Sequence, residues 1–143
     1  MTTENDDANI RSVIGRVVDS WNRHDMHSFA ALFAQDADFV DVFGNWFRNR
    51  EAIERVLTER HASVFKDSRF TEKEVVIRMP KGDLAVVHTV LELSGAFDPQ
   101  GNPLPPGLGV MTYVLHKADS DWRIIALQNT AVAPPRAPAE PPR

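Results

Sequence analysis

One aspartate lies among aromatic residues in the segment Trp21 to Gly44, which reads WNRHDMHSFAALFAQDADFVDVFG. In an extended strand Phe39, Asp41 and Phe43 share a face, because side chains alternate with a period of two. Aromatic neighbours exclude water from a carboxylate and raise its pKa toward the range where it exchanges protons with a substrate. The pattern therefore predicts a general acid or base at Asp41. The alternative is a structural carboxylate paired with a histidine, an arginine or a helix end.

Two histidines are candidates to assist that carboxylate in catalysis. His61 lies on the apolar stripe of an expected helix, one turn beyond Leu57, where an imidazole can relay a proton or donate a hydrogen bond. His88 lies among valines in the run AVVHTV and needs a polar partner there. The direction in which His88 faces stays open, because a bulge would reverse it. For each histidine the alternative is a structural bond to a backbone carbonyl or a neighbouring acid.

A ligand pocket is expected around these residues. Gln128 and Asn129 are adjacent on the last expected strand and face opposite sides, and parity with Ile124 and Ala126 places Gln128 inside. Its carboxamide can donate to and accept from a ligand carbonyl or hydroxyl. The predicted apolar walls of the pocket are Trp21, Phe33, Phe39, Phe43 and Tyr113.

Other chemistries lack a motif in this chain. There is no cysteine, no HxH and no HExxH pattern, so no metal site is expected. The absence of GxSxG and GKS/T patterns disfavours a nucleophilic serine or a phosphate-binding loop, which leaves chemistry without a cofactor. The net charge of −4 and the scattered basic residues predict that neither nucleic acid nor an anionic membrane is a partner.

Helices are expected first along the chain. Apolar residues recur at offsets of three and four over about 7 to 22, which predicts the first helix. Asp25 is the expected N-cap of a second helix that ends near Ala34, and Asn49 that of a third. A strand over about 37 to 43 lies between these two helices and carries Asp41.

The second half of the chain reads as strands. The runs EVVIRM, DLAVVHTVLEL, GVMTYVLHK and DWRIIALQNT follow Asp67 and are separated mostly by short turns, which favours antiparallel pairing. Helices first and strands last predict an α+β fold in which a curved sheet closes over the helices. We expect one domain over 7–131, a disordered segment over 1–6 and a proline-rich flexible tail over 132–143.

Some of these strands are apolar on both faces, as Val86 and Val90 on one side and Val87 and Leu91 on the other illustrate. An antiparallel sheet with water on its outer face would alternate more regularly. We therefore expect a homodimer that covers the outer face. The acidic start lacks the pattern of a signal peptide, and no apolar run reaches membrane-spanning length, so a cytoplasmic location is expected.

The order of these elements, together with the pattern WN..D......LFA.DA.F.D..G, resembles the SnoaL-like, nuclear-transport-factor-2-like superfamily over about residues 8–131. The ending DWRIIALQNT and the AVVH strand resemble its SgcJ/EcaC-like branch. The resemblance implies a cone-shaped, mostly antiparallel sheet wrapped around three helices. Such folds host isomerases, dehydratases and cyclases as well as non-catalytic binding and association domains.

Within this superfamily, ketosteroid isomerase has an acid strand, DATVEDPVG, that matches DADFVDVFG and places Asp41 on the catalytic base. Its oxyanion hole needs a tyrosine and a protonated aspartate, whereas Val17 and Met111 take those positions here. The resemblance thus implies a pocket for a small apolar or aromatic ligand and, for an enzyme, isomerase, dehydratase or cyclase chemistry other than ketosteroid isomerisation. The alternative is a non-catalytic ligand-binding or dimerisation module with a closed polar network.

Overall fold

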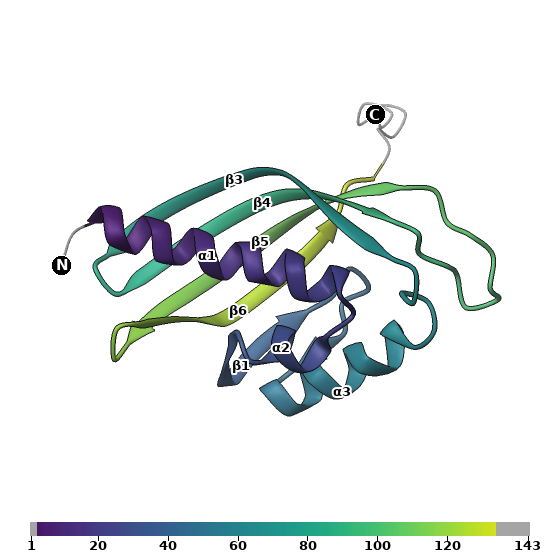
Figure 1. Ribbon diagram of the computed structural model, residues 1–143, viewed down its shortest axis with the longest axis horizontal. Helices are drawn as coiled ribbons and strands as arrows, with labels where there is room; N and C mark the ends of the chain where they lie inside the picture. Colours follow the sequence, from purple (N-terminus) through teal and green to yellow (C-terminus); the bar gives the residue numbers. More distant parts are fainter. Residues whose placement is uncertain (1–2, 134–143) are drawn as a thin grey trace, which may run out of the picture.

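Three helices pack against a curved sheet in the computed structural model, which describes residues 3–133 (Figure 1). The predicted α+β class and the helix-first order are confirmed, and a short strand, β2, is an addition to the prediction. The elements are α1 (Thr3–Asn22), α2 (Met26–Ala30), β1 (Phe33–Val40), β2 (Trp46–Phe47), α3 (Arg50–His61), β3 (Arg69–Lys81), β4 (Leu84–Ser94), β5 (Gly107–Ala118) and β6 (Asp121–Ala131).

The six strands form one mixed sheet in the order β2-β1-β6-β5-β4-β3. All neighbours are antiparallel except β1 and β6, which run parallel. That parallel pair brings Val40, the last residue of β1, opposite Gln128. The turn that carries Asp41 therefore lies beside the second half of β6.

Helix α1 begins earlier than the sequence pattern suggested. It starts at Thr3, and Asp6 is buried, with its Oδ1 accepting hydrogen bonds from Nζ of Lys117 at 2.9 Å and Nε1 of Trp122 at 3.2 Å. The prediction of disorder over 1–6 is therefore wrong for residues 3–6. Residues 1–2 and 134–143, which include most of the predicted tail, lie outside the described residues.

The second helix is shorter than predicted, because it ends at Ala30 and the chain enters β1 at Phe33. Both predicted N-caps are confirmed. The side chains of Asp25 and Asn49 accept hydrogen bonds from the backbone N–H three residues further on, at 3.0 and 2.8 Å. Each cap satisfies a donor that a helix start leaves without an intrahelical partner.

The core lies between α1 and the inner face of the sheet. In Figure 1, α1 runs across strands β3 to β6, while α2 and α3 gather at one end beside β1. The buried stripe of α1 consists of Ile10, Val13, Ile14, Val17 and Trp21, as the helical offsets predicted. Within residues 3–133, no helix combines the length and the apolar character that crossing a membrane requires.

Candidate functional site

Asp41 lies in the turn between β1 and β2, where hydrogen bonds surround its carboxylate. Its Oδ1 accepts from the backbone N–H groups of Phe43 and Asn45, each at 2.9 Å. Its Oδ2 accepts from Nδ2 of Asn45 at 2.9 Å and forms an ion pair with Nη2 of Arg60 at 2.9 Å. Gly44 supplies the left-handed backbone of this turn, with φ of +84°. An aspartate side chain that bonds to backbone N–H groups further along the chain is a common way to fix a tight turn.

These contacts reverse the expected electrostatics of Asp41. Burial raises the pKa of Asp41, but the donors on Asn45, Arg60 and Phe43 together outweigh burial and hold the pKa below its ordinary value of 3.8. The prediction of a net rise in this pKa is therefore wrong. Strand β1 ends before Asp41, so Phe43 does not share a strand face with it and is 81% exposed. The predicted place of Phe43 in a pocket wall is also wrong.

Arg60 is brought to Asp41 by the last turn of α3. The guanidinium also lies over the ring of Phe47, with 5.4 Å between its central carbon and the ring centroid. Only 7% of the Asp41 side chain and 23% of the Arg60 side chain are exposed. The ion pair therefore ties α3 to the β1–β2 turn in a region that little water reaches.

His61 follows Arg60 and is buried, as its position on the helical stripe predicted. Its Nδ1 lies 2.8 Å from Nδ1 of His24, and its ring meets that of Trp21 nearly at right angles, with 4.3 Å between centroids. Its Nε2 is buried without a hydrogen-bond partner among residues 3–133. Burial, and then the nearby His24, lower the pKa of His61 to about 4, so this imidazole is neutral at pH 7.

His61 also lines a pocket of about 350 Å³ between α3 and the corner where α1 meets α2. We call this the histidine pocket. It is lined by His24, Asp25, Met26, His27, Glu54, Thr58, His61 and Ala62. Nδ1 of His27 lies 3.3 Å from the carboxylate of Glu54. Within the described part of the chain, no three histidine, aspartate or glutamate side chains are grouped so that they could hold a metal ion.

No local sequence pattern signals the contact between His24 and His61, which are 37 residues apart. His24 lies between α1 and α2 and is exposed. A backbone φ of +56° at His24 turns the chain between α1 and α2, and this turn presents its ring to α3. A non-glycine residue with positive φ is the kind of feature that only a structure reveals.

Two of the predicted polar site residues lie outside the cone. His88 pairs with Val76 and is exposed on the outer sheet face, and Gln128 is exposed as well. The register between β5 and β6 shifts at Ile125, so residues after it face the side opposite to the one that alternation from Ile124 predicts. The prediction that Gln128 faces inward is therefore wrong. Asn129 takes the inner position opposite Met111, and its Oδ1 is buried without a hydrogen-bond partner in residues 3–133.

The other predicted wall residues form core. Trp21, Phe33, Phe39 and Tyr113 are buried and belong to one cluster, in which Trp21 stacks on Phe70 with 4.0 Å between ring centroids. The Tyr113 hydroxyl donates to Sδ of Met111 at 3.2 Å, and burial raises the pKa of Tyr113. Four pockets lie on the described surface. Of the predicted site residues, His61 alone lines one of these four, the histidine pocket.

Comparison with solved structures finds the same fold in several bacterial proteins. An uncharacterised protein with a cystatin-like fold from Caulobacter vibrioides is 25% identical, with 89% of each chain covered and a TM-score of 0.84. A domain of unknown function with a cystatin-like fold from Nostoc punctiforme is 27% identical, with 94% of this chain and 81% of that chain covered and a TM-score of 0.79. A ketosteroid isomerase-like protein from Erwinia carotovora atroseptica is 19% identical, with 89% and 96% covered and a TM-score of 0.71.

A comparison with curated proteins finds no match. The family model described as SnoaL-like domain matches residues 14–120, a span that begins within α1 and ends at the β5–β6 turn. This match covers most of the chain and agrees with the fold described above. The chain therefore belongs to the SnoaL-like domain family.

Proposed function

We propose that this domain binds a small hydroxylated ligand in the histidine pocket and that Asp41 is a structural residue. The observation that carries the proposal is the set of four contacts that occupy both oxygens of the Asp41 carboxylate. A general base needs a free lone pair directed at the substrate and a pKa near the working pH. Asp41 has neither, because its pKa is lowered and its oxygens already accept hydrogen bonds. Of the two interpretations of the sequence, this favours the non-catalytic module.

The histidine pocket, in contrast, offers polar groups that a ligand can engage. One proton is shared between Nδ1 of His24 and Nδ1 of His61, because the 2.8 Å contact needs one donor and one acceptor. The face of an aromatic ring carries partial negative charge, so it attracts an N–H donor and repels a nitrogen lone pair. With the Trp21 ring centroid 4.3 Å from that of His61, we infer the tautomer in which His61 carries its proton on Nε2 and accepts at Nδ1. His24 then donates through Nδ1 and presents Nε2 as an acceptor.

A ligand that carries hydroxyl groups can form hydrogen bonds with three groups of this pocket. They are Nε2 of His24, the Thr58 hydroxyl and the Glu54 carboxylate. Met26 and Ala62 line the same pocket and suit an apolar part of that ligand. A volume of about 350 Å³ is at the lower end of the range for small-molecule sites. We therefore infer that the ligand is about the size of a substituted phenol.

Phenol, catechol and tyramine are suitable probes, with toluene as the probe that lacks a polar group. We expect the hydroxylated probes to raise the melting temperature and toluene to have a smaller effect.

His24→Gln and Thr58→Val should reduce this shift in melting temperature, because each removes a group that lines the pocket. His116→Gln is the matched control, since it removes a histidine of β5 whose side chain is 43% exposed and does not line the pocket. Asp41→Asn should retain the shift relative to its own baseline. A probe whose shift depends on Asp41 and is unaffected by His24→Gln would contradict the proposal.

Proton transfer at the histidine pair is a second candidate function. The 2.8 Å contact favours it, because His24 can relay a proton that neutral His61 accepts. A pKa of about 4 makes His61 a weak base, which ranks this candidate below ligand binding. Exchange of solvent deuterium into a ketone probe such as 2-tetralone, followed by NMR, tests it. Exchange above the buffer rate that His61→Gln abolishes would support catalysis, and exchange at the buffer rate would contradict it.

We also propose that two copies associate through the outer sheet face. Val76 is 50% exposed there, and the half-buried Val86, Val90, Val110 and Val114 extend the apolar surface over β4 and β5. A homodimer would cover this face with the same surface of a second copy. Membership of the SgcJ/EcaC-like branch stays a prediction.

Sedimentation at micromolar concentration tests the association. We expect Val76→Glu to shift the protein toward the monomer, because the substitution places charge in the covered surface. Leu104→Glu is the matched control, since Leu104 is 45% exposed but lies in the β4–β5 connection. A wild-type protein that sediments as a monomer would refute the dimer.

A further inference from the structure

A larger pocket lies on the other side of the α1–α2 corner, where α1, α2 and the β5–β6 turn meet. Its volume is about 790 Å³, which is within the range for small-molecule sites. We call it the arginine groove. Its polar lining includes Arg16, Ser20, Arg23, Ser28, Ser120 and Arg123.

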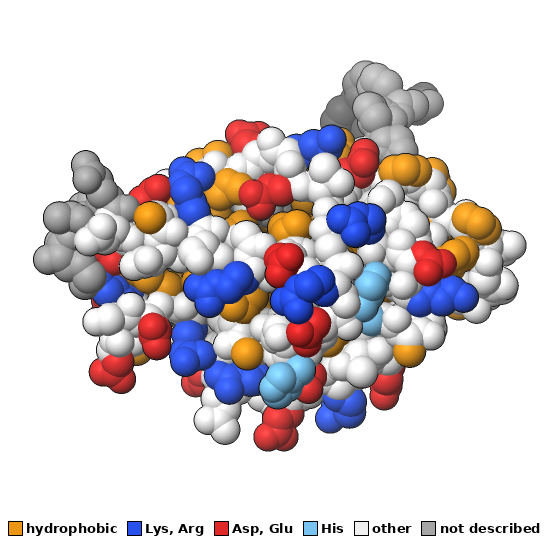
Figure 2. All heavy atoms as spheres, in the orientation of Figure 1, with side chains coloured by type: hydrophobic (Ala, Val, Ile, Leu, Met, Phe, Trp, Pro, Cys, Tyr) orange, Lys and Arg blue, Asp and Glu red, His pale blue; other side chains and the backbone are white. Residues whose placement is uncertain are grey.

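One face of α1 forms a wall of the arginine groove. Asn9, Val13, Arg16, Ser20 and Arg23 all line it, and their spacing of three or four residues places them in one stripe along the helix. This stripe shares Val13 with the stripe that packs into the core. The space-filling view shows basic side chains gathered along α1 and just below it, with acidic ones between them (Figure 2).

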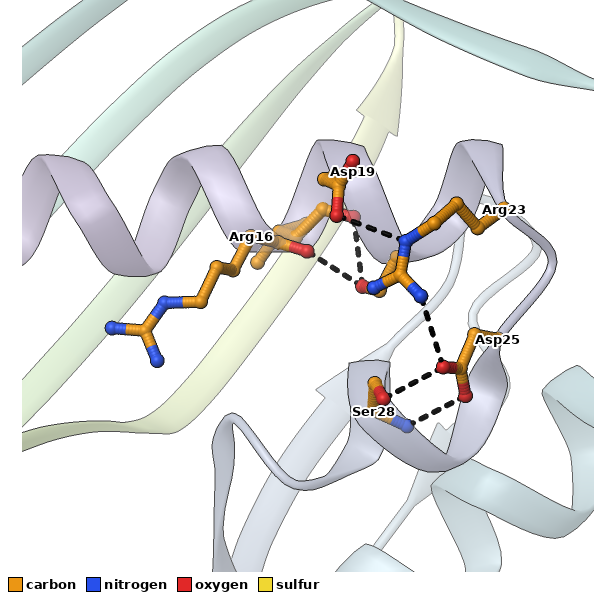
Figure 3. Close-up of polar contacts among 7 residues, drawn as sticks. Arg16, Asp19, Arg23, Asp25 and Ser28 are labelled. Atoms are coloured by element: carbon orange, nitrogen blue, oxygen red, sulfur yellow. Dashed lines mark hydrogen bonds and ion pairs between the residues drawn. The ribbon is translucent and has the colours of Figure 1, made fainter.

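The arginine nearest the corner is already neutralised. Nε of Arg23 lies 3.0 Å from Oδ2 of Asp19, and its Nη1 lies 3.2 Å from Oδ2 of Asp25. Asp25 also accepts hydrogen bonds from the backbone N–H and the hydroxyl of Ser28, at 3.0 and 2.7 Å. Figure 3 shows this chain of contacts, while the side chain of Arg16 extends away from it. Arg23 therefore has a structural role in the groove wall and is not assigned to ligand binding.

Two further arginines have no acidic partner among residues 3–133. Arg16 bonds only to Ser12 one turn earlier, at 3.4 Å to its carbonyl and 3.2 Å to its hydroxyl. Arg123, at the start of β6, donates to the carbonyl oxygen of Ala31 at 3.2 Å. Each guanidinium has five N–H donors, so most donors of both side chains are available to a ligand. Among the described residues that line the groove, Asp121 is the one acid.

This placement is notable in an acidic chain with a net charge of −4. Among the described lining residues there are three arginines and one aspartate, whereas the chain as a whole has more acidic than basic residues. Guanidinium groups bind carboxylate and phosphate through paired hydrogen bonds. Ala31 and Leu32 line the same groove and can contact an apolar part of a ligand.

We propose that the arginine groove binds a small organic anion, with the anionic group between Arg16 and Arg123 and the apolar part against Leu32. The shared chemistry is a carboxylate or a phosphate ester on a compact apolar body. This site is separate from the histidine pocket, so it stands whether or not that pocket binds a hydroxylated ligand.

The probes are phenyl phosphate, benzoate and uncharged benzamide, titrated by calorimetry at low and high salt. We expect both anions to bind and benzamide to bind far more weakly, and the preferred anion identifies the phosphate or the carboxylate class. Arg16→Gln and Arg123→Gln should each weaken binding about tenfold, because each removes a charge-assisted hydrogen bond. Added salt should weaken binding further, because the anion is held near an exposed surface.

Arg11→Gln is the matched control, since Arg11 is an exposed arginine of α1 that pairs with Asp7 and does not line the groove. It should leave anion affinity within about twofold of the wild type. His24→Gln should also bind the anions normally, which separates this site from the histidine pocket. If Arg11→Gln and Arg16→Gln lowered the anion affinity equally, the binding would reflect the general charge of the surface, and the proposal would be overturned. Unchanged affinity in Arg16→Gln and Arg123→Gln, or no saturable binding of either anion, would overturn it as well.

Discussion

Two of the aspartate–arginine ion pairs among residues 3–133 share their chemistry but not their surroundings. In the pair Asp41 and Arg60, the atoms are 2.9 Å apart and the side chains are 7% and 23% exposed. In the pair Asp25 and Arg23, the atoms are 3.2 Å apart and the side chains are 35% and 55% exposed. Both aspartates also accept backbone N–H groups, and the pKa of each is lowered. Burial is what separates them.

The energetic role of each carboxylate depends on whether water can solvate its arginine partner once the carboxylate is removed. Water can reach Arg23 if Asp25 is lost, whereas Arg60 would keep its charge where water has little access. The two regions are joined by the histidine contact, because His24 lies between the members of one pair and His61 follows Arg60. Perturbing each region in turn should therefore produce a ranked series of effects.

The largest effect is expected for Asp41→Ala. The substitution removes the acceptor for two backbone N–H groups and leaves Arg60 without its ion-pair partner. We expect the free energy of unfolding to fall by on the order of 3 kcal/mol, as is typical when one partner of a poorly solvated pair is removed. Urea denaturation at pH 7 measures this change. Asp36→Ala is the control, because Asp36 is an exposed acid of β1.

The same pair should respond to acid. The pKa of Asp41 is lower in the folded state, so its contribution to stability is complete above the ordinary value of 3.8 and is lost as the pH falls through the folded pKa. In Asp41→Ala this part of the acid sensitivity should be absent. Equal sensitivity of wild type and variant below pH 4 would show that the pair is not what the acid disrupts.

The next effect is expected from His61, in a separate pH window. Its pKa is about 4 in the folded state and 6.5 ordinarily, so the unfolded chain binds more protons between these values. Stability should therefore fall as the pH drops from 6.5 to 4, by on the order of 2 kcal/mol after allowance for solvent screening. Urea midpoints across this range measure the slope. His61→Phe should flatten it.

A histidine whose side chain is 43% exposed supplies the control for this pH window. His116→Gln removes a histidine that lies 3.5 Å from Asp83 at the surface. Its midpoints should follow the wild-type slope between pH 6.5 and 4. A wild-type slope that persists in His61→Phe would mean that another group carries the proton linkage.

The comparison also shows where sequence patterns succeed and where they fail. The stripe of α1 and the caps Asp25 and Asn49 were predictable, because helical offsets and capping chemistry are local properties. The end of β1 before Asp41 was not predictable from such patterns. The Asp41 side chain accepts hydrogen bonds from the backbone N–H groups of Phe43 and Asn45, and these bonds compete with the hydrogen bonds of a sheet. A local competition of this kind ended β1 early.

The facing of residues on β6 failed for a different reason. A single shift at Ile125 moves Gln128 to the outer face and brings Asn129 inward, and no residue type in the run DWRIIALQNT signals that shift. The contact between His24 and His61 was equally hidden, because it depends on how α3 docks against the α1–α2 corner. Local structure was therefore readable, while the composition of the site depended on register and docking.

A smaller effect is expected for Asp25→Ala. The substitution removes the N-cap of α2 and one partner of Arg23, but the exposed surroundings let water replace both contacts. We expect a decrease in the urea midpoint that is roughly half of that in Asp41→Ala or less. Asp25→Asn keeps the cap and loses the charge, so it should recover most of the midpoint. A loss as large as that of Asp41→Ala would remove the distinction between the two pairs.

The smallest effect is expected for Arg23→Gln, although this residue contacts two acids. Arg23 is 55% exposed and Asp19 is 64% exposed, so screening by water and the entropy of holding long side chains offset the attraction. We expect no measurable change in the urea midpoint at physiological salt. A double-mutant cycle of Arg23→Gln with Asp25→Asn measures the coupling directly. A strong coupling in that cycle would mean that the corner behaves like the buried Asp41 pair despite its exposure, and that burial is not what ranks the two regions.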